Sequence, residues 1–156
     1  MTGPYSVPDD SSTPYPITFE RVQALMHSMG YQIDFLVEGR VAGAVFDKIP
    51  FLFSVDSAGR FLSVRAIWEV DTPAQELDGT YFTAADQWNR ENYFPTIYST
   101  TTENGRGHVC ADFALDAEAG VSDDQLRDAI SVGISTGIEA ITYMKSTTGT
   151  NSAADR

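Results

Sequence analysis

The sequence predicts an α+β fold in the order α-β-β-β-α-β-β-α, with an antiparallel sheet and helices packed mainly on one face. Two observations lead to this prediction. Residues 31–72 alternate apolar and polar side chains in runs separated by turn residues, which is typical of an antiparallel meander with one buried face. Helical patterns with start signals, at residues 18–29 and 122–144, lie on either side of the strands.

Thr18 is suited to the N-cap of the first helix, and Ile17 before it can pack against Val22. Gly30 provides the left-handed exit from this helix. His27 lies off the apolar stripe, and we expect it to be solvated. The expected buried face consists of Val22, Leu25, Met26 and Met29.

The strand pattern begins at Ile33, is interrupted at residues 38–40 and resumes at Val41. A second strand follows at residues 51–55, and the next strand begins after the turn at residues 56–59. This third strand alternates most clearly. Its predicted inner face is Leu62, Val64, Ala66, Trp68 and Val70, and its outer face is Phe61, Ser63, Arg65, Ile67 and Glu69.

A short helix is expected from Thr83, its N-cap, to about Asn92, with Trp88 on the core side and Pro95 preventing its continuation. Residues 96–101 are β-branched and aromatic, which favours a strand. An Asn-Gly hairpin loop leads to the return strand. That strand is expected to bury Val109, Ala111, Phe113 and Leu115, with His108, Cys110 and Asp112 on its other face.

The final helix has the clearest start signal, because Ser122 and Gln125 form a capping-box pair after the apolar Val121. Gly133 and Gly137 lie within its apolar stripe. Each glycine costs a helix about 1 kcal/mol relative to alanine. We therefore expect close backbone packing there, against the sheet or another helix, to offset that cost.

Residues 1–16 hold four prolines among small polar residues and predict an extended arm. The arm is either a free tail, which we favour, or lies on the domain through Tyr5, Val7 and Tyr15. We expect a single α+β domain at residues 17–146, and a disordered polar tail at residues 147–156.

Composition excludes several classes of function. The chain of 156 residues has one cysteine and therefore no intramolecular disulfide. No apolar run reaches the ~20 residues of a membrane span, and the N-terminus lacks a signal-peptide pattern. We expect a cytoplasmic protein without a membrane partner. The net charge of −12, without a basic cluster, disfavours nucleic acid as a partner because binding requires Lys and Arg at phosphates.

No catalytic, metal or cofactor motif is recognisable in the sequence. The strongest candidate is His108, Cys110 and Asp112, which alternation brings to one face of a strand. Residues two apart on a strand are separated by ~7 Å, so a metal site would need further ligands from elsewhere. The simpler interpretation is a half-exposed sheet face beside Arg65 and Glu69.

Several segments, taken in order, resemble the YbjN family. These are Gly30-Tyr31 after the first helix, V-R-A-I-W at Val64–Trp68, W-N-R-E-x-x-F-P-x-x-Y at Trp88–Tyr98, and the Ser-x-x-Gln start of the last helix. The resemblance covers about residues 17–146, and Trp88–Tyr98 is its most specific part. Its structural motif is represented here by Trp88, Asn89, Pro95 and Tyr98.

The resemblance implies a fold like that of type III secretion chaperones, which are small acidic dimers that bind client segments without catalysis. The family is described as a bacterial sensory transduction regulator, and no catalytic residue can be carried over from it. A homodimer is implied by the same analogy. Fold by itself does not transfer function.

We therefore predict a non-enzymatic module that binds a protein partner in a chaperone-like way and needs no cofactor. Exposed apolar groups on a sheet often mark an interface, and Phe61 and Ile67 are expected on the outer face. The candidate partner-binding residues are Phe61, Arg65, Ile67, Glu69, His108 and Asp112. The alternative is a small ligand-binding or enzymatic domain that uses the His108/Cys110/Asp112 face.

Overall fold

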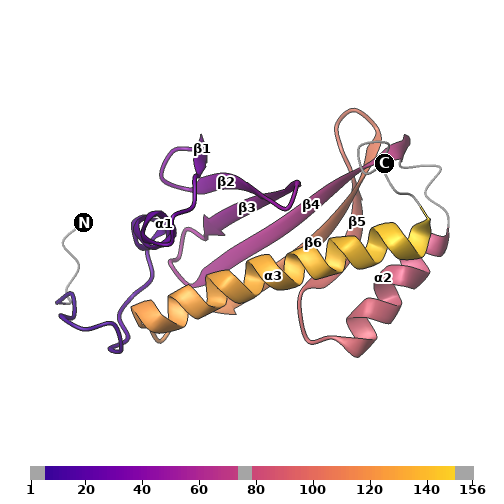
Figure 1. Ribbon diagram of the computed structural model, residues 1–156. Helices are drawn as coiled ribbons and strands as arrows, with labels where there is room; N and C mark the ends of the chain where they lie inside the picture. The colour runs from indigo at the N-terminus through magenta and orange to yellow at the C-terminus, as the bar shows by residue number, and fades with distance from the viewer. Residues whose placement is uncertain (1–5, 74–78, 150–156) are drawn as a thin grey trace. The chain divides into compact units, whose positions relative to one another are not determined.

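The computed structural model describes residues 6–73 and 79–149, with the backbone alone at residues 71–73. Figure 1 shows its helices and strands. The helices are α1 (Phe19–Ser28), α2 (Gly79–Glu91) and α3 (Asp123–Thr148). The strands are β1 (Asp34–Val37), β2 (Val41–Phe46), β3 (Ile49–Val55), β4 (Phe61–Pro73), β5 (Thr96–Thr101) and β6 (Arg106–Asp116).

The strands form one six-stranded sheet in the order β1-β2-β3-β4-β6-β5. The predicted α+β class with an antiparallel sheet is confirmed, with one strand more than expected before α2. The extra strand arises because the interruption at residues 38–40 is a hairpin turn. Arg40 donates its backbone N–H to the carbonyl of Val37, and Gly39 has a φ of +71°, which favours glycine.

The contacts divide the chain into two compact units, each of which takes part of the sheet and part of α3. Unit 1 consists of Met1–Ala44, Leu52–Val64 and Ala114–Val132. Unit 2 consists of Val45–Phe51, Arg65–Phe113 and Gly133–Arg156.

Both predicted helix caps of unit 1 are present. The Thr18 hydroxyl accepts the N–H of Arg21 at 3.1 Å and so begins α1. Ser122 and Gln125 form a reciprocal capping box, in which Gln125 N–H donates to Ser122 Oγ and Ser122 N–H donates to Gln125 Oε1. Phe19, Val22, Leu25 and Met26 are buried, whereas Met29 is half-buried and His27 is exposed as expected.

Residues 11–16 of the N-terminal arm lie against other parts of unit 1. Tyr15 and Val121 exchange both backbone hydrogen bonds, and Ser11 Oγ donates to Asp124. The Arg21 guanidinium donates to the Tyr15 carbonyl and the Asp123 carboxylate, and stacks over the Tyr15 ring. For Tyr15, this is the second of the two expected arrangements. Val7 is exposed, and Tyr5 lies outside the described residues.

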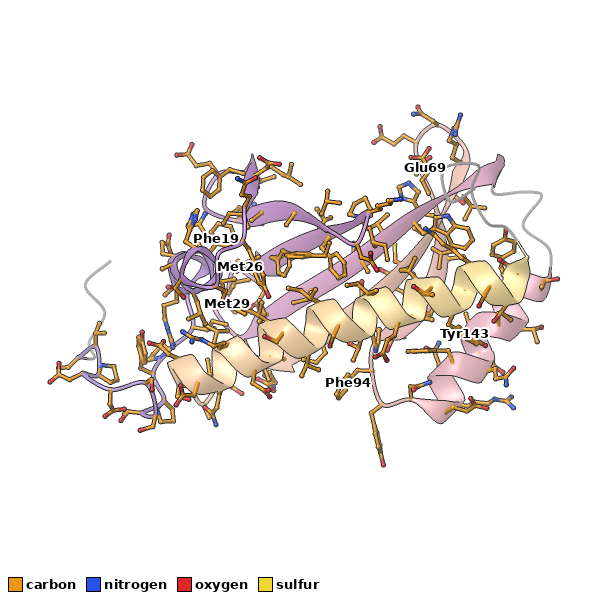
Figure 2. All side chains as sticks on the ribbon, in the orientation of Figure 1. Phe19, Met26, Met29, Glu69, Phe94 and Tyr143 are labelled. Atoms are coloured by element: carbon orange, nitrogen blue, oxygen red, sulfur yellow. The ribbon has the colours of Figure 1, made fainter. Side chains whose placement is uncertain are left out.

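In unit 2, α2 packs beside the C-terminal half of α3 (Figure 1). Figure 2 shows Tyr143 of α3 beside α2, where its hydroxyl donates to the Ala84 carbonyl at 2.8 Å. The helix α2 begins at Gly79, four residues before the predicted N-cap Thr83. That cap prediction was wrong, because the buried residue Tyr81 places the first turn against the core.

Gly137 makes the close contact that its place in the α3 stripe predicts. A Cβ atom at Gly137 would lie 2.7 Å from Phe51 Cε2 and 3.2 Å from the Cβ of Ala66. Phe51 belongs to β3 and Ala66 to β4, so the backbone of α3 at Gly137 lies too close to the sheet to leave room for a side chain. The helix continues to Thr148, so the first residues of the expected tail are helical, and residues 150–156 lie outside the described residues.

Candidate functional site

The segment Trp88–Tyr98 joins α2 to the edge strand β5, and its motif side chains hold this connection. Trp88 is 9% exposed, and its indole N–H donates to the Pro95 carbonyl at 3.0 Å. Its ring packs 5.2 Å from that of Tyr143 on α3. Trp88 thus ties the helix to the turn that follows it, as a buried indole needs a hydrogen-bond partner.

Asn89 provides the next connection. Its amide donates to the Ile97 carbonyl at 2.9 Å, and its side-chain oxygen accepts the Ile97 N–H at 2.9 Å. The carboxamide therefore satisfies both backbone groups of one β5 residue, as a neighbouring strand would do. Asn89 fixes the distance between α2 and β5.

A groove lies between α2 and β5, with a volume of about 460 Å³. Ten residues line it: Tyr81, Phe82, Ala85, Asp86, Asn89, Ile97, Tyr98, Ser99, Thr100 and Thr101. The sequence analysis did not find this groove. A signal was present, because Phe82, Ala85, Asp86 and Asn89 follow the i, i+3, i+4, i+7 spacing of one helix face.

Two of the residues on the predicted outer face, Arg65 and Asp112, form a bonded cluster with Tyr98 in unit 2. Arg65 of β4 binds Asp112 of β6 through two N–H···O contacts of 2.7 and 3.0 Å. The Tyr98 hydroxyl donates to the same carboxylate at 2.8 Å. Burial raises the pKa of Tyr98, and its hydrogen bond to Asp112 adds to this effect. The family-motif residue Tyr98 therefore anchors β5 to the sheet face.

Glu69 and His108, further along the same strands, also lie close together. Arg106 donates to Glu69 at 3.3 Å, and His108 Nε2 lies 3.8 Å from the other Glu69 oxygen. Ile67, between Arg65 and Glu69 on β4, is half-buried. Unit 2 thus brings together five of the six candidate partner-binding residues on adjacent strands. The sixth, Phe61, belongs to unit 1 and is 40% exposed.

Cys110 lies in the same strand as His108 and Asp112 but is buried, with 3% of its surface exposed. Burial raises the pKa of its thiol, and the Arg65 charge only partly opposes this. A nucleophilic or metal-binding cysteine needs a lowered pKa and access to its partner. These features do not favour the enzymatic alternative.

Two further findings concern the described residues only. No three of their His, Cys, Asp and Glu side chains are grouped so that they could hold a metal ion. None of their helices combines the length and the apolar character that crossing a lipid bilayer requires.

The fold and its motif now allow comparison with known proteins. The family model described as "YbjN: Putative bacterial sensory transduction regulator" matches residues 18–145. The chain belongs to the YbjN family. This confirms the resemblance seen in the segments of the sequence, over nearly the same residues. No curated protein matches the sequence.

Solved structures resemble this chain at low sequence identity. The structure titled as that of YbjN, "a putative transcription regulator from E. coli", has a TM-score of 0.67 at 10% identity, covering 88% of this chain and 96% of that chain. A chain of the HopA1–SchA chaperone–effector complex has a TM-score of 0.50 at 15% identity, with coverages of 83% and 99%. The Yersinia pestis type III secretion chaperone SycH in complex with a YscM2 fragment has a TM-score of 0.44 at 12% identity, with coverages of 78% and 97%.

Proposed function

We propose that this YbjN-family chain is a non-enzymatic regulatory protein that acts in the cytoplasm and binds a segment of a partner protein as a chaperone does. The observation that carries the proposal is the exposure of large apolar side chains in short runs. Phe35, Leu36 and Val37 are consecutive and exposed on β1, and Tyr93 and Phe94 are adjacent and exposed after α2. Grouped exposed apolar side chains of this kind mark interaction surfaces.

The fold supports this proposal without deciding it. A chain of a chaperone–effector complex has the same fold, but at 15% identity the likeness concerns the fold alone. The net charge of −12 favours partners with basic segments over nucleic acids.

We propose that the outer face of β4 and β6 adds polar contacts to the partner. Arg65 pairs with Asp112, and Glu69 pairs with Arg106 and lies 3.8 Å from His108 Nε2, so the face presents a fixed pattern of charged and polar groups around Ile67. Fixed charges of this kind contribute more to specificity and association rate than to affinity. Phe61 belongs to unit 1 and is proposed as a separate contact there: its ring is 40% exposed, and the Arg60 guanidinium lies 4.9 Å from its centroid.

The chain is also proposed to form a homodimer through β1. This strand ends the sheet, and all four of its residues are exposed. An antiparallel pairing of an edge strand with its own copy around a two-fold axis is self-complementary. Exposed apolar edge strands that remain unpaired risk aggregation, so a covering partner is expected.

Light scattering after size exclusion tests this dimer with the substitution Phe35→Lys. We expect the wild-type chain to have the mass of a dimer and the variant to dissociate, because charged side chains, especially Lys, block edge pairing. Val45→Lys, at an exposed position of β2, is the matched control and should remain dimeric. A wild-type monomer at high concentration, or a dimer unaffected by Phe35→Lys, would contradict the proposal.

The partner itself is found by capture from a bacterial lysate with the tagged chain, followed by direct binding between purified proteins. We expect at least one recovered protein to bind after nuclease treatment. Recovery that depends entirely on nucleic acid would instead favour a nucleic-acid-binding regulator, and retention of the pure chain on heparin at physiological salt would support that reading.

A further inference from the structure

The strand β5 is the last of the sheet, so one of its edges faces no other strand. Ile97 turns its N–H and C=O toward that edge, because both bond to Asn89. Alternate residues of a strand turn these groups to the same side, so Ser99 and Thr101 do likewise. Both residues are exposed, and within residues 6–73 and 79–149 no hydrogen bond reaches their outward backbone groups.

The groove beside this edge has a lining that suits one more strand. Phe82, Ala85 and Asp86 of α2 face Ser99 and Thr101 across it. Phe82 is 75% exposed and can cover the apolar side chain of a segment that pairs with β5. At Ile97 the Asn89 carboxamide already occupies the place of a strand partner, so it marks where the available edge ends.

The charge of the groove indicates what kind of segment it accepts. Asp86 is the acidic residue among those that line it, and its carboxylate is half-exposed in a surface pair with Arg90 at 3.0 Å. Exposed pairs of this kind contribute little, so a cation from a partner can replace Arg90. The net charge of −12 attracts basic segments over a longer range.

Building on the proposed protein-binding function, we infer that the groove between α2 and β5 binds an extended segment of a partner protein as an added strand. The segment would pair its backbone with Ser99 and Thr101. Its side chains would alternate, with apolar groups packing against Phe82 and basic groups reaching Asp86. In this mode the main chain supplies affinity and the alternate side chains supply specificity.

The substitution Ser99→Pro tests this inference, since it removes the outward N–H. Proline is tolerated at an edge strand where the N–H faces away from the ladder, so pairing of β5 with β6 should survive. The probe is a phage-displayed library of peptides of about nine residues, long enough to span a five-residue edge of ~17 Å. It is selected on the full chain and the recovered peptides are synthesised.

We expect the recovered peptides to alternate apolar and basic residues. Their affinity for Ser99→Pro should be about tenfold or more below their affinity for the wild type, which is the loss expected from one or two backbone hydrogen bonds. Methylation of alternate peptide amides should weaken binding equally. Val45→Ala, which shortens an exposed apolar side chain outside the groove lining, should bind as the wild type does. If Ser99→Pro does not fold, Phe82→Ala takes its place, with the same expected direction.

Three results would overturn the inference. The library could yield no peptide, or only peptides that bind the wild type and Ser99→Pro equally. The wild type could instead self-associate in a way that Ser99→Pro abolishes, which would assign the edge to a second copy. If a purified partner protein binds wild type and Ser99→Pro equally, this inference fails while the proposed function stands. If no partner protein binds either chain, the proposed function fails.

Discussion

Replacement of Trp88 by alanine should lower the free energy of unfolding by about 3–5 kcal/mol, the range for a large aromatic removed from a core. Trp88 is 9% exposed and packs 5.2 Å from the Tyr143 ring. The substitution also leaves the Pro95 carbonyl without its indole donor. Denaturant unfolding followed by circular dichroism measures the loss.

Two variants separate the contributions at Trp88. Trp88→Phe keeps most of the ring volume but loses the hydrogen bond to Pro95, so it should cost about 1–3 kcal/mol. Tyr93→Ala removes a fully exposed ring from the same connection and should change stability by about 0.5 kcal/mol or less. A Trp88→Ala variant with unchanged unfolding would remove its structural role and make the residue a candidate for binding.

Replacement of Gly137 by valine should destabilise the fold by roughly 1–3 kcal/mol, because added atoms must displace a packed core. Even a Cβ atom would lie 2.7 Å from the ring of Phe51, which is buried and contacts the Phe46 ring edge-on at 5.5 Å. The same Cβ atom would also lie 3.2 Å from the Cβ of Ala66, so the added side chain would meet β4 as well as Phe51.

The control for Gly137→Val is Glu139→Val, at an exposed position of the same helix. It introduces the same side chain without the core contact, so it should change stability only by the helix propensity of valine, about 0.5 kcal/mol. Thermal or denaturant unfolding of both variants measures the difference. Equal unfolding of the two would contradict the close packing of α3 on β3 and β4.

Local signals predicted much of the fold from the sequence. The Ser122–Gln125 capping box, the Thr18 cap and the alternation of β4 depend on neighbouring residues only, and each appears in the structure. The Gly137 contact was also predictable, because a glycine in an apolar helix stripe needs a close neighbour to offset its cost.

Other features depend on tertiary packing and could not be found locally. The helix α2 begins before Thr83 because Tyr81 is buried, with its ring 6.2 Å from that of Trp68. Cys110 occupies the outer face expected from alternation, yet it is buried next to Tyr98 on the adjacent strand. Alternation assigns a face to a residue but not what covers that face.

The candidate site also has one part that local sequence predicts and one part that depends on tertiary packing. Strand alternation placed Arg65 and Asp112 on one face, and the structure joins them in an ion pair. The groove between α2 and β5 requires the pairing of β5 with β6 and the bonds of Asn89 to Ile97, neither of which follows from local sequence. The Trp88–Tyr98 motif marked the right segment, and the structure shows that its side chains hold the helix against the strand.

The central claim is that this YbjN-family protein binds a protein partner. Its most direct test is calorimetric titration of the purified chain with a purified protein that the chain captures from the lysate. We predict saturable binding at physiological salt with a dissociation constant of about 100 µM or tighter and a negative heat-capacity change from buried apolar surface. The absence of binding by every captured protein, once each is pure and free of nucleic acid, would contradict the account.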